Sequence, residues 1–167
     1  MIVIIFSVSG SGKTTLGKLL AHELRWRFYE ADDFHSQANI EKLRCGVSLT
    51  DEDRLPWLEK LRDLIKRCVE SRENAVLACS ALKRAYRERL SVSAEVKFVF
   101  LRGSRALIAQ QLHHRRGHFM NPALLQSQFE DLEEPKPDED ALTIELGGTP
   151  QELVEEIKIK LHLARKG

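Results

Sequence analysis

The sequence lacks several features that mark membrane and nucleic-acid proteins. Within its 167 residues, no apolar run approaches the length of a transmembrane helix, and the apolar run at residues 2–6 is too short for a signal peptide. No charge of one sign dominates, because 26 Lys and Arg oppose 25 Asp and Glu. This balance argues against a protein that coats nucleic acid or an anionic membrane. We therefore expect a cytoplasmic protein without nucleic-acid or membrane partners.

Cysteine is also scarce. The three cysteines, at positions 45, 68 and 79, are odd in number and lack metal-ligand spacing. They argue against a disulfide-stapled fold and are typical of reduced thiols in a reducing compartment.

The most informative stretch is Ser-Val-Ser-Gly-Ser-Gly-Lys-Thr at residues 7–14. It joins the apolar run at 2–6, which predicts a buried strand, to a segment with helical periodicity from about 12 to 23. A strand, a glycine-containing loop and Lys-Thr at a helix start are typical of a phosphate-binding P-loop. Backbone N–H groups would surround the phosphates, Lys13 would bridge them, and Thr14 would ligate Mg²⁺. The predicted ATP-binding residues are Ser9, Gly10, Ser11, Gly12, Lys13, Thr14 and Thr15.

One position departs from the usual pattern G-x-x-x-x-G-K-[ST], because Ser7 replaces the first glycine. Ser7 has a Cβ, so it must adopt a backbone conformation that ordinary residues can reach. The alternative is that the loop is only a Gly/Ser-rich turn between a strand and a helix.

Predicted strands alternate with helices along the chain, which indicates a parallel α/β sheet. Further strands are expected at 27–30, 75–79, 96–101 and 142–146. Helices are expected at 36–43, from a cap at 50–53 to about 72, at 105–114, and after a capping box at 149–152. Residues 50–53, Thr-Asp-Glu-Asp, offer N-cap candidates for the third helix. If Asp53 is the cap, Pro56 lies in the first turn. We expect one P-loop NTPase domain over 1–167, with a five-stranded parallel sheet flanked by helices. Two mobile insertions, a substrate cover at about 33–56 and a lid at about 115–137, would line the crevice at the carboxyl ends of the strands.

A P-loop alone does not define a reaction. The sequence has no Asn-Lys-x-Asp for guanine recognition, and no apolar run that ends in Asp-x-x-Gly or Asp-Glu. These absences argue against GTPases, switches and motors. The remaining class is the small-molecule kinase with movable covers, on the adenylate-kinase-like plan.

Several separated motifs narrow this class further. They are Ala-Asp-Asp-Phe-His at 31–35, Asn-Ile-Glu-Lys-Leu at 39–43, Leu-Thr-Asp-Glu-Asp-Arg-Leu-Pro-Trp-Leu at 49–58, Cys-Ser-Ala-Leu-Lys-Arg-Ala-Tyr-Arg at 79–87, and Gly-His-Phe at 117–119 followed by Leu-Leu-Gln-Ser-Gln-Phe-Glu at 124–130. With these motifs the chain resembles the gluconokinase family. The resemblance implies an adenylate-kinase-like fold, ATP and Mg²⁺ as cofactors, and phosphorylation of D-gluconate to 6-phosphogluconate. It also suggests a homodimer.

Two acidic residues near the end of the second strand are the first candidates. Asp32 is the predicted base for the substrate hydroxyl, and Glu30, two residues earlier on the same strand face, would hold a Mg²⁺-bound water. The alternative for Asp32 is a helix N-cap.

A sugar acid requires cations for its carboxylate and hydrogen-bonding side chains for its hydroxyls. The predicted substrate-binding residues are Asp32, His35, Arg54, Lys83, His118 and Gln128. Three of them also have a simpler interpretation: Arg54 as a solvated partner of Asp51 and Asp53, Lys83 as part of a basic helix face, and His118 as a surface histidine. Their joint occurrence on crevice loops favours binding.

Arg115 and Arg116 open the second insertion, where a closing lid would bring a guanidinium group onto the transferring phosphate. We expect catalytic roles for Lys13, Asp32, Arg115 and Arg116, and an ATP contact from Arg115. Rival functions are a same-fold kinase for shikimate or a nucleoside monophosphate, and a non-catalytic nucleotide-binding module that uses the basic helix at 83–89.

Overall fold

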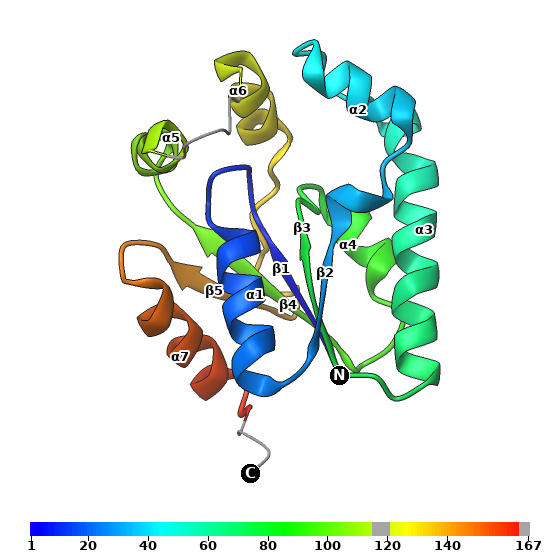
Figure 1. Ribbon diagram of the computed structural model, residues 1–167, viewed down its shortest axis with the longest axis vertical. Coiled ribbons are helices and arrows are strands. Elements are labelled where there is room, and N and C mark those ends of the chain that lie inside the picture. The colour runs from blue at the N-terminus through cyan, green and yellow to red at the C-terminus, as the bar shows by residue number, and fades with distance from the viewer. Residues whose placement is uncertain (115–120, 164–167) are drawn as a thin grey trace.

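The computed structural model describes residues 1–114 and 121–163. Within these ranges the chain forms a five-stranded parallel sheet with the order β2-β3-β1-β4-β5 (Figure 1). The strands are β1 (Ile2–Phe6), β2 (Arg27–Glu30), β3 (Ala75–Cys79), β4 (Val96–Arg102) and β5 (Ala141–Glu145). The predicted α/β class and parallel sheet are confirmed.

The helices cover both faces of this sheet. They are α1 (Lys13–Leu24), α2 (Gln37–Arg44), α3 (Asp51–Glu70), α4 (Arg84–Leu90), α5 (Arg105–His114), α6 (Pro122–Asp131) and α7 (Pro150–Lys160), with a 3₁₀ turn, η1 (Ala31–Phe34), after β2. No helix within the described ranges has the length and apolar character needed to span a bilayer.

The central strand β1 is apolar throughout because both of its faces are covered. Ile4 and Phe6 point into a core shared with α3 and α4. Val3 and Ile5 point into a second core shared with α1 and α7. This double coverage fixes the end of β1 and therefore the position of the loop that follows it.

Two helices begin at capping boxes. Thr149 caps α7 and pairs with Glu152, as the sequence predicts. The cap of α3 is Thr50, whose hydroxyl accepts from the Asp53 backbone N–H, so the first of the predicted candidates at 50–53 is the cap and Asp53 is not. Consequently α3 begins earlier than expected, and Pro56 lies inside the helix rather than in its first turn.

The helix α6 lies within the predicted lid at 115–137, a polar segment for which no helix was predicted. Asn121 accepts from the Ala123 backbone N–H, and Pro122 occupies the first helical position. Figure 1 shows α2, α5 and α6 above the carboxyl ends of the strands, on the same side as the loop between β1 and α1. The segments that carry predicted site residues therefore lie at one edge of the sheet.

Candidate active site

The loop between β1 and α1 has the backbone of a phosphate cradle. Gly10 and Gly12 have φ angles of 81° and 95°, in the left-handed region that favours glycine. A Cβ on Gly10 would also collide with the Leu112 side chain of α5. Ser7 does not belong to the residues with positive φ, and its buried hydroxyl donates to the Leu101 carbonyl at 2.7 Å. Serine is therefore compatible with the first position of this loop.

Lys13 and Thr14 start α1 beside the loop. The Lys13 ammonium donates to the Val8 carbonyl at 3.0 Å. The Thr14 hydroxyl donates to a Glu30 carboxylate oxygen at 2.5 Å. Burial raises the pKa of Glu30, although this hydrogen bond opposes the shift. A hydroxyl and a carboxylate thus face each other at the edge of the cradle.

This pair fits the modest protein contribution that Mg²⁺ needs when phosphates and waters supply its other ligands. Among the described residues, no group of three His, Cys, Asp or Glu side chains is arranged to hold a metal by itself. A metal here would depend on Thr14, Glu30 and a bound nucleotide together.

A cleft of about 470 Å³ extends from the cradle. It lies between the loop and α1, the α5 helix, and the turn between β5 and α7. Its lining residues are Gly10, Ser11, Gly12, Thr15, Leu16, Leu107, Gln110, Gln111, His114, Leu146, Gly147, Gly148, Pro150 and Leu153. Its size suits one small ligand. Gly147 and Gly148, which line one side of the cleft, were not predicted. The signal was present in the sequence, because two consecutive glycines follow the last predicted strand.

The Ser11 hydroxyl in this lining is buried and has no hydrogen-bond partner within the described part of the chain. A buried unpaired hydroxyl is costly, by about 1–3 kcal/mol. It is therefore a candidate to pair with a ligand.

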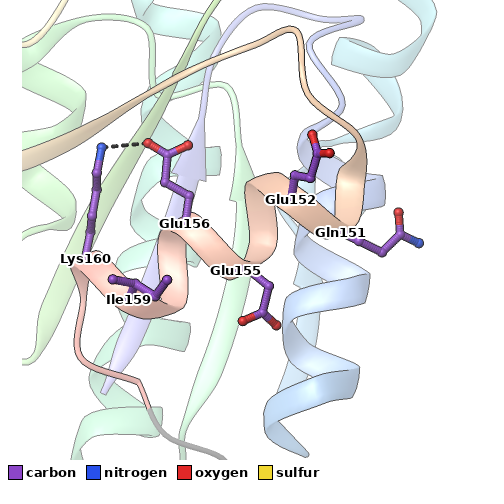
Figure 2. Close-up of a pocket in the computed structure, with 6 residues that line it drawn as sticks. All are labelled: Gln151, Glu152, Glu155, Glu156, Ile159 and Lys160. Carbon is purple, nitrogen blue, oxygen red and sulfur yellow. Dashed lines mark hydrogen bonds and ion pairs between the residues drawn. The ribbon is translucent and has the colours of Figure 1, made fainter.

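A second hollow has no such chemistry. Figure 2 shows that its labelled side chains all project from α7, and the Ile159 side chain lies among carboxylates there. Ile159 is 71% exposed. The hollow is an outer helix face rather than an enclosed site.

Asp32 lies in η1 and not on β2, because the chain turns out of the sheet directly after Glu30. Asp32 and Glu30 therefore do not share a strand face, and this prediction is wrong. The N-cap alternative is also wrong, since Ser36 caps α2 by accepting from the Asn39 backbone N–H. The Asp32 side chain is 74% exposed, which leaves its carboxylate open to a ligand.

His35 packs against the base of the same turn. Its imidazole stacks on Trp57, with ring centroids 4.5 Å apart, and its Nε2 lies 3.9 Å from Asp32 Oδ1. Burial lowers the pKa of His35, and the positive charge of Arg54 lowers it further, whereas Asp32 opposes the shift. A neutral imidazole next to a carboxylate suits hydrogen bonding to hydroxyl groups.

Arg54 is largely buried in a contact between three helices. Its Nη1 donates to the Tyr86 hydroxyl at 3.0 Å and its Nη2 to Asp131 at 3.1 Å, and only 12% of the side chain is exposed. The interpretation of Arg54 as a solvated partner of Asp51 and Asp53 is therefore wrong.

Lys83 is joined to Arg54 by a chain of hydrogen bonds through Asp51 and Tyr86. The Lys83 ammonium donates to Asp51 at 2.9 Å, and the Tyr86 hydroxyl donates to the same carboxylate. Tyr86 in turn accepts from Arg54. The sequence analysis assigned no role to Tyr86 or Asp131, although Tyr86 follows Lys83 by three residues, within one helical turn. The structure thus brings two of the predicted cations into one polar network.

The other predicted residues fall into two groups. Gln128 contacts the cradle: its Oε1 accepts from the Ser9 backbone N–H at 2.7 Å, and its Nε2 donates to the Ser9 hydroxyl at 3.1 Å. Arg115, Arg116 and His118 lie outside the described residues, so their roles stay predictions.

A parallel sheet with a P-loop after β1, cations at the same edge and a helix above it are the features of small-molecule P-loop kinases. Comparison with known proteins narrows this class. The shikimate kinase family matches residues 9–160. A probable gluconokinase of Rattus norvegicus is 44% identical over 170 residues, which cover 90% of this chain and 92% of the relative.

Solved structures agree. A sugar kinase from a Janibacter species superposes with a TM-score of 0.92 at 40% identity, covering 98% of this chain and 95% of the other. A gluconokinase from Sinorhizobium meliloti 1021 gives 0.85 at 41% identity, with 96% and 90% covered. The chain belongs to the gluconokinase family.

Proposed function

We propose that this protein transfers the γ-phosphoryl group of ATP to D-gluconate and forms 6-phospho-D-gluconate and ADP. The observation that carries the proposal is the placement of Arg54 and Lys83 in one hydrogen-bond network with Tyr86 and Asp51, at the sheet edge that also carries the P-loop. Two cations beside a phosphate cradle suit an acceptor that is itself an anion. Relatives named gluconokinases, at 40–45% identity, support the choice of this acid.

The nucleotide is proposed to lie in the cleft beside the P-loop, with its phosphates against residues 9–15. Backbone N–H groups and the Lys13 ammonium would stabilise the charge that develops on the transferring group. Thr14 and Glu30 would hold Mg²⁺, which neutralises phosphate charge when it is bound. The Ser11 hydroxyl, which has no hydrogen-bond partner among the described residues, supports a ligand with acceptor atoms here.

The acceptor is proposed to place its carboxylate near Arg54 and Lys83 and its hydroxyls near His35 and Asp32. The exposed Asp32 carboxylate would accept the proton of the attacking hydroxyl as the new P–O bond forms and the bond to ADP breaks. Burial of His35 favours its neutral form, which can donate to one oxygen and accept from another group.

Three further parts of the proposal extend the expectations from the sequence. Arg115 and Arg116 would contact the transferring phosphate, with Arg115 also on ATP, and His118 would contact the acid. The segments at 33–56 and 115–137 would close over the substrates as parts of a single domain. The proposal also includes a cytoplasmic location and a homodimer. The three cysteines, all within the described ranges, form no disulfide, which suits a reducing compartment.

The test is coupled ADP release by purified protein with Mg-ATP and one acceptor at a time: D-gluconate, shikimate, glycerate, AMP or none. Turnover with D-gluconate alone supports the proposal. Equal ADP release with every acceptor, or turnover only with shikimate, would show that the assigned acceptor is wrong.

A matched pair of variants tests the base. Asp32→Asn removes the proton acceptor, whereas Asp33→Asn changes the neighbouring exposed carboxylate in the same turn. We expect Asp32→Asn to lower kcat by at least about 100-fold, at the low end of general-base effects, with little change in the KM for ATP. Equal kcat values for the two variants would remove Asp32 from this role.

A further inference from the structure

The helix α6 contacts elements of both predicted substrate sites. Its apolar residues Leu125 and Phe129 pack against a buried cluster that includes Val8, the P-loop residue next to Ser9. Its polar residues reach the cover segment and α3. One helix of ten residues therefore lies between the nucleotide cradle and the cations that are proposed to bind the acid.

On the nucleotide side, Gln128 holds Ser9 at two points. The side-chain carbonyl accepts from the Ser9 N–H, and the side-chain amide donates to the Ser9 hydroxyl. Paired hydrogen bonds of this kind fix both the position and the orientation of a peptide unit. Movement of α6 would therefore change the shape of the cradle.

On the acid side, Asp131 holds Arg54 and Ser127 holds the cover. The Asp131 carboxylate accepts from Arg54 Nη2 at 3.1 Å, and only 27% of that carboxylate side chain is exposed. The Ser127 hydroxyl is hydrogen-bonded to Ser48, in the segment between α2 and α3. Ser127 and Asp131 are four residues apart and share one face of α6, which is turned toward the cover and α3.

We propose that Asp131 and Gln128 are positioning residues through which α6 couples the two substrate sites. Asp131 orients Arg54 for the carboxylate of the acceptor, and Gln128, one residue beyond Ser127, transmits the placement of α6 to the P-loop. The proposal rests on the function proposed above, since it needs an anionic acceptor at Arg54.

The consequence is reciprocal coupling of binding. An acceptor that engages Arg54 favours the arrangement of α6 in which Ser9 is held, so it tightens nucleotide binding, and the nucleotide tightens acceptor binding by the same factor. Burial of Arg54 makes the pairing specific, because a largely buried guanidinium must keep its acceptors. Coupling of this kind also limits ATP hydrolysis in the absence of acceptor.

The experiment measures the Kd of a non-hydrolysable ATP analogue with Mg²⁺ by calorimetry, with and without saturating D-gluconate. We expect D-gluconate to tighten the analogue by about tenfold in the unmodified protein, within the usual range for coupled sites. In Asp131→Asn and Gln128→Ala, the ratio of the Kd without D-gluconate to the Kd with it should fall below about twofold, which means that the two sites are nearly uncoupled. The controls are Glu130→Gln and Gln126→Ala, exposed neighbours on α6 whose side chains are hydrogen-bonded to each other and, within the described residues, to no other side chain.

Retention of the tenfold ratio in Asp131→Asn and Gln128→Ala would overturn the proposal, as would its loss in the two controls. If Asp131→Asn does not fold, as judged by circular dichroism, Gln128→Ala decides alone. D-gluconate that binds and turns over without affecting analogue affinity would overturn the coupling but not the function. Failure of D-gluconate to bind at all would overturn both.

Discussion

The imidazole of His35 lies flat on the indole of Trp57, with their planes inclined by 11°. The same indole donates its N–H to the Ala31 carbonyl at 2.8 Å. Trp57 therefore contacts Ala31, the first residue of η1, and His35, the residue directly after this turn. Since Asp32 lies between these two contacts, a buried aromatic residue of α3 supports the turn that presents the proposed base.

This support predicts a catalytic effect for Trp57→Phe. The change leaves the buried Ala31 carbonyl without its donor, which should lower the free energy of unfolding by about 1–3 kcal/mol. Loosening of the turn should lower kcat about tenfold, since small displacements of reacting groups reduce rates strongly. Urea denaturation and steady-state kinetics would measure both. The control is Trp26→Phe, on the opposite face of the sheet; an equal loss of kcat there would contradict the argument.

The lowered pKa of His35 predicts a pH-dependent stability. Because its folded pKa lies below the ordinary value of about 6.5, the unfolded chain binds more protons between the two values. The contribution of His35 is therefore fully present above about pH 6.5 and is lost as pH falls toward the folded pKa.

The measurement is the free energy of unfolding at pH 7.5 and at pH 5.5. His35→Gln should show a smaller decrease on acidification than the unmodified protein. His22→Gln, exposed on α1, should keep the full decrease. The same pH dependence in both variants would show that His35 is not the group responsible.

The framework of the fold was predictable from local patterns. Apolar runs such as that of β1 and the Thr149 capping box are governed by neighbouring residues, and their predictions are confirmed. The P-loop was predictable for the same reason, since glycine at positions 10 and 12 meets a local backbone requirement. Ser7 did not disturb it because its φ needs no glycine.

The errors arose where contacts between distant segments decide the structure. Asp32 leaves the strand because η1 is held by Trp57, 25 residues later, which no alternation pattern along β2 reveals. The partner of Arg54 is Asp131, 77 residues away, whereas the sequence suggested the adjacent acids. The helix α6 was not predicted because the residues it packs against, including Val8 and Leu82, are also distant from it in the sequence. Long-range packing overrides local preference in each case.

The hydrogen bond between Thr14 and Glu30 predicts a requirement for the Thr14 hydroxyl. Thr14→Ala should lower kcat by roughly 100-fold and raise the Mg²⁺ concentration at half-maximal rate, since a charge-stabilising contact is lost. Thr14→Ser keeps the hydroxyl and should stay near the unmodified rate. Kinetics at saturating ATP with varied free Mg²⁺ would measure both effects. Similar kinetics for the alanine and serine variants would contradict a role for the hydroxyl.

Arg87 predicts the largest loss of stability on α4. Its side chain, only 2% exposed, pairs with Glu139 and donates to the carbonyls of Ala81, Leu82 and Glu133. Arg87→Met leaves a buried carboxylate and these carbonyls without their donor, so it should cost about 3–5 kcal/mol in unfolding free energy.

The matched control is Arg89→Met, two residues further along α4. The Arg89 guanidinium pairs with Glu59 at the surface, and such pairs contribute at most about 1 kcal/mol. Urea unfolding followed by circular dichroism should therefore separate the two variants clearly. Similar midpoints would mean that the Arg87 contacts do little to stabilise the fold. A large difference would identify Arg87 as the residue that ties the segment after α6, through Glu133 and Glu139, to the loop carrying Lys83.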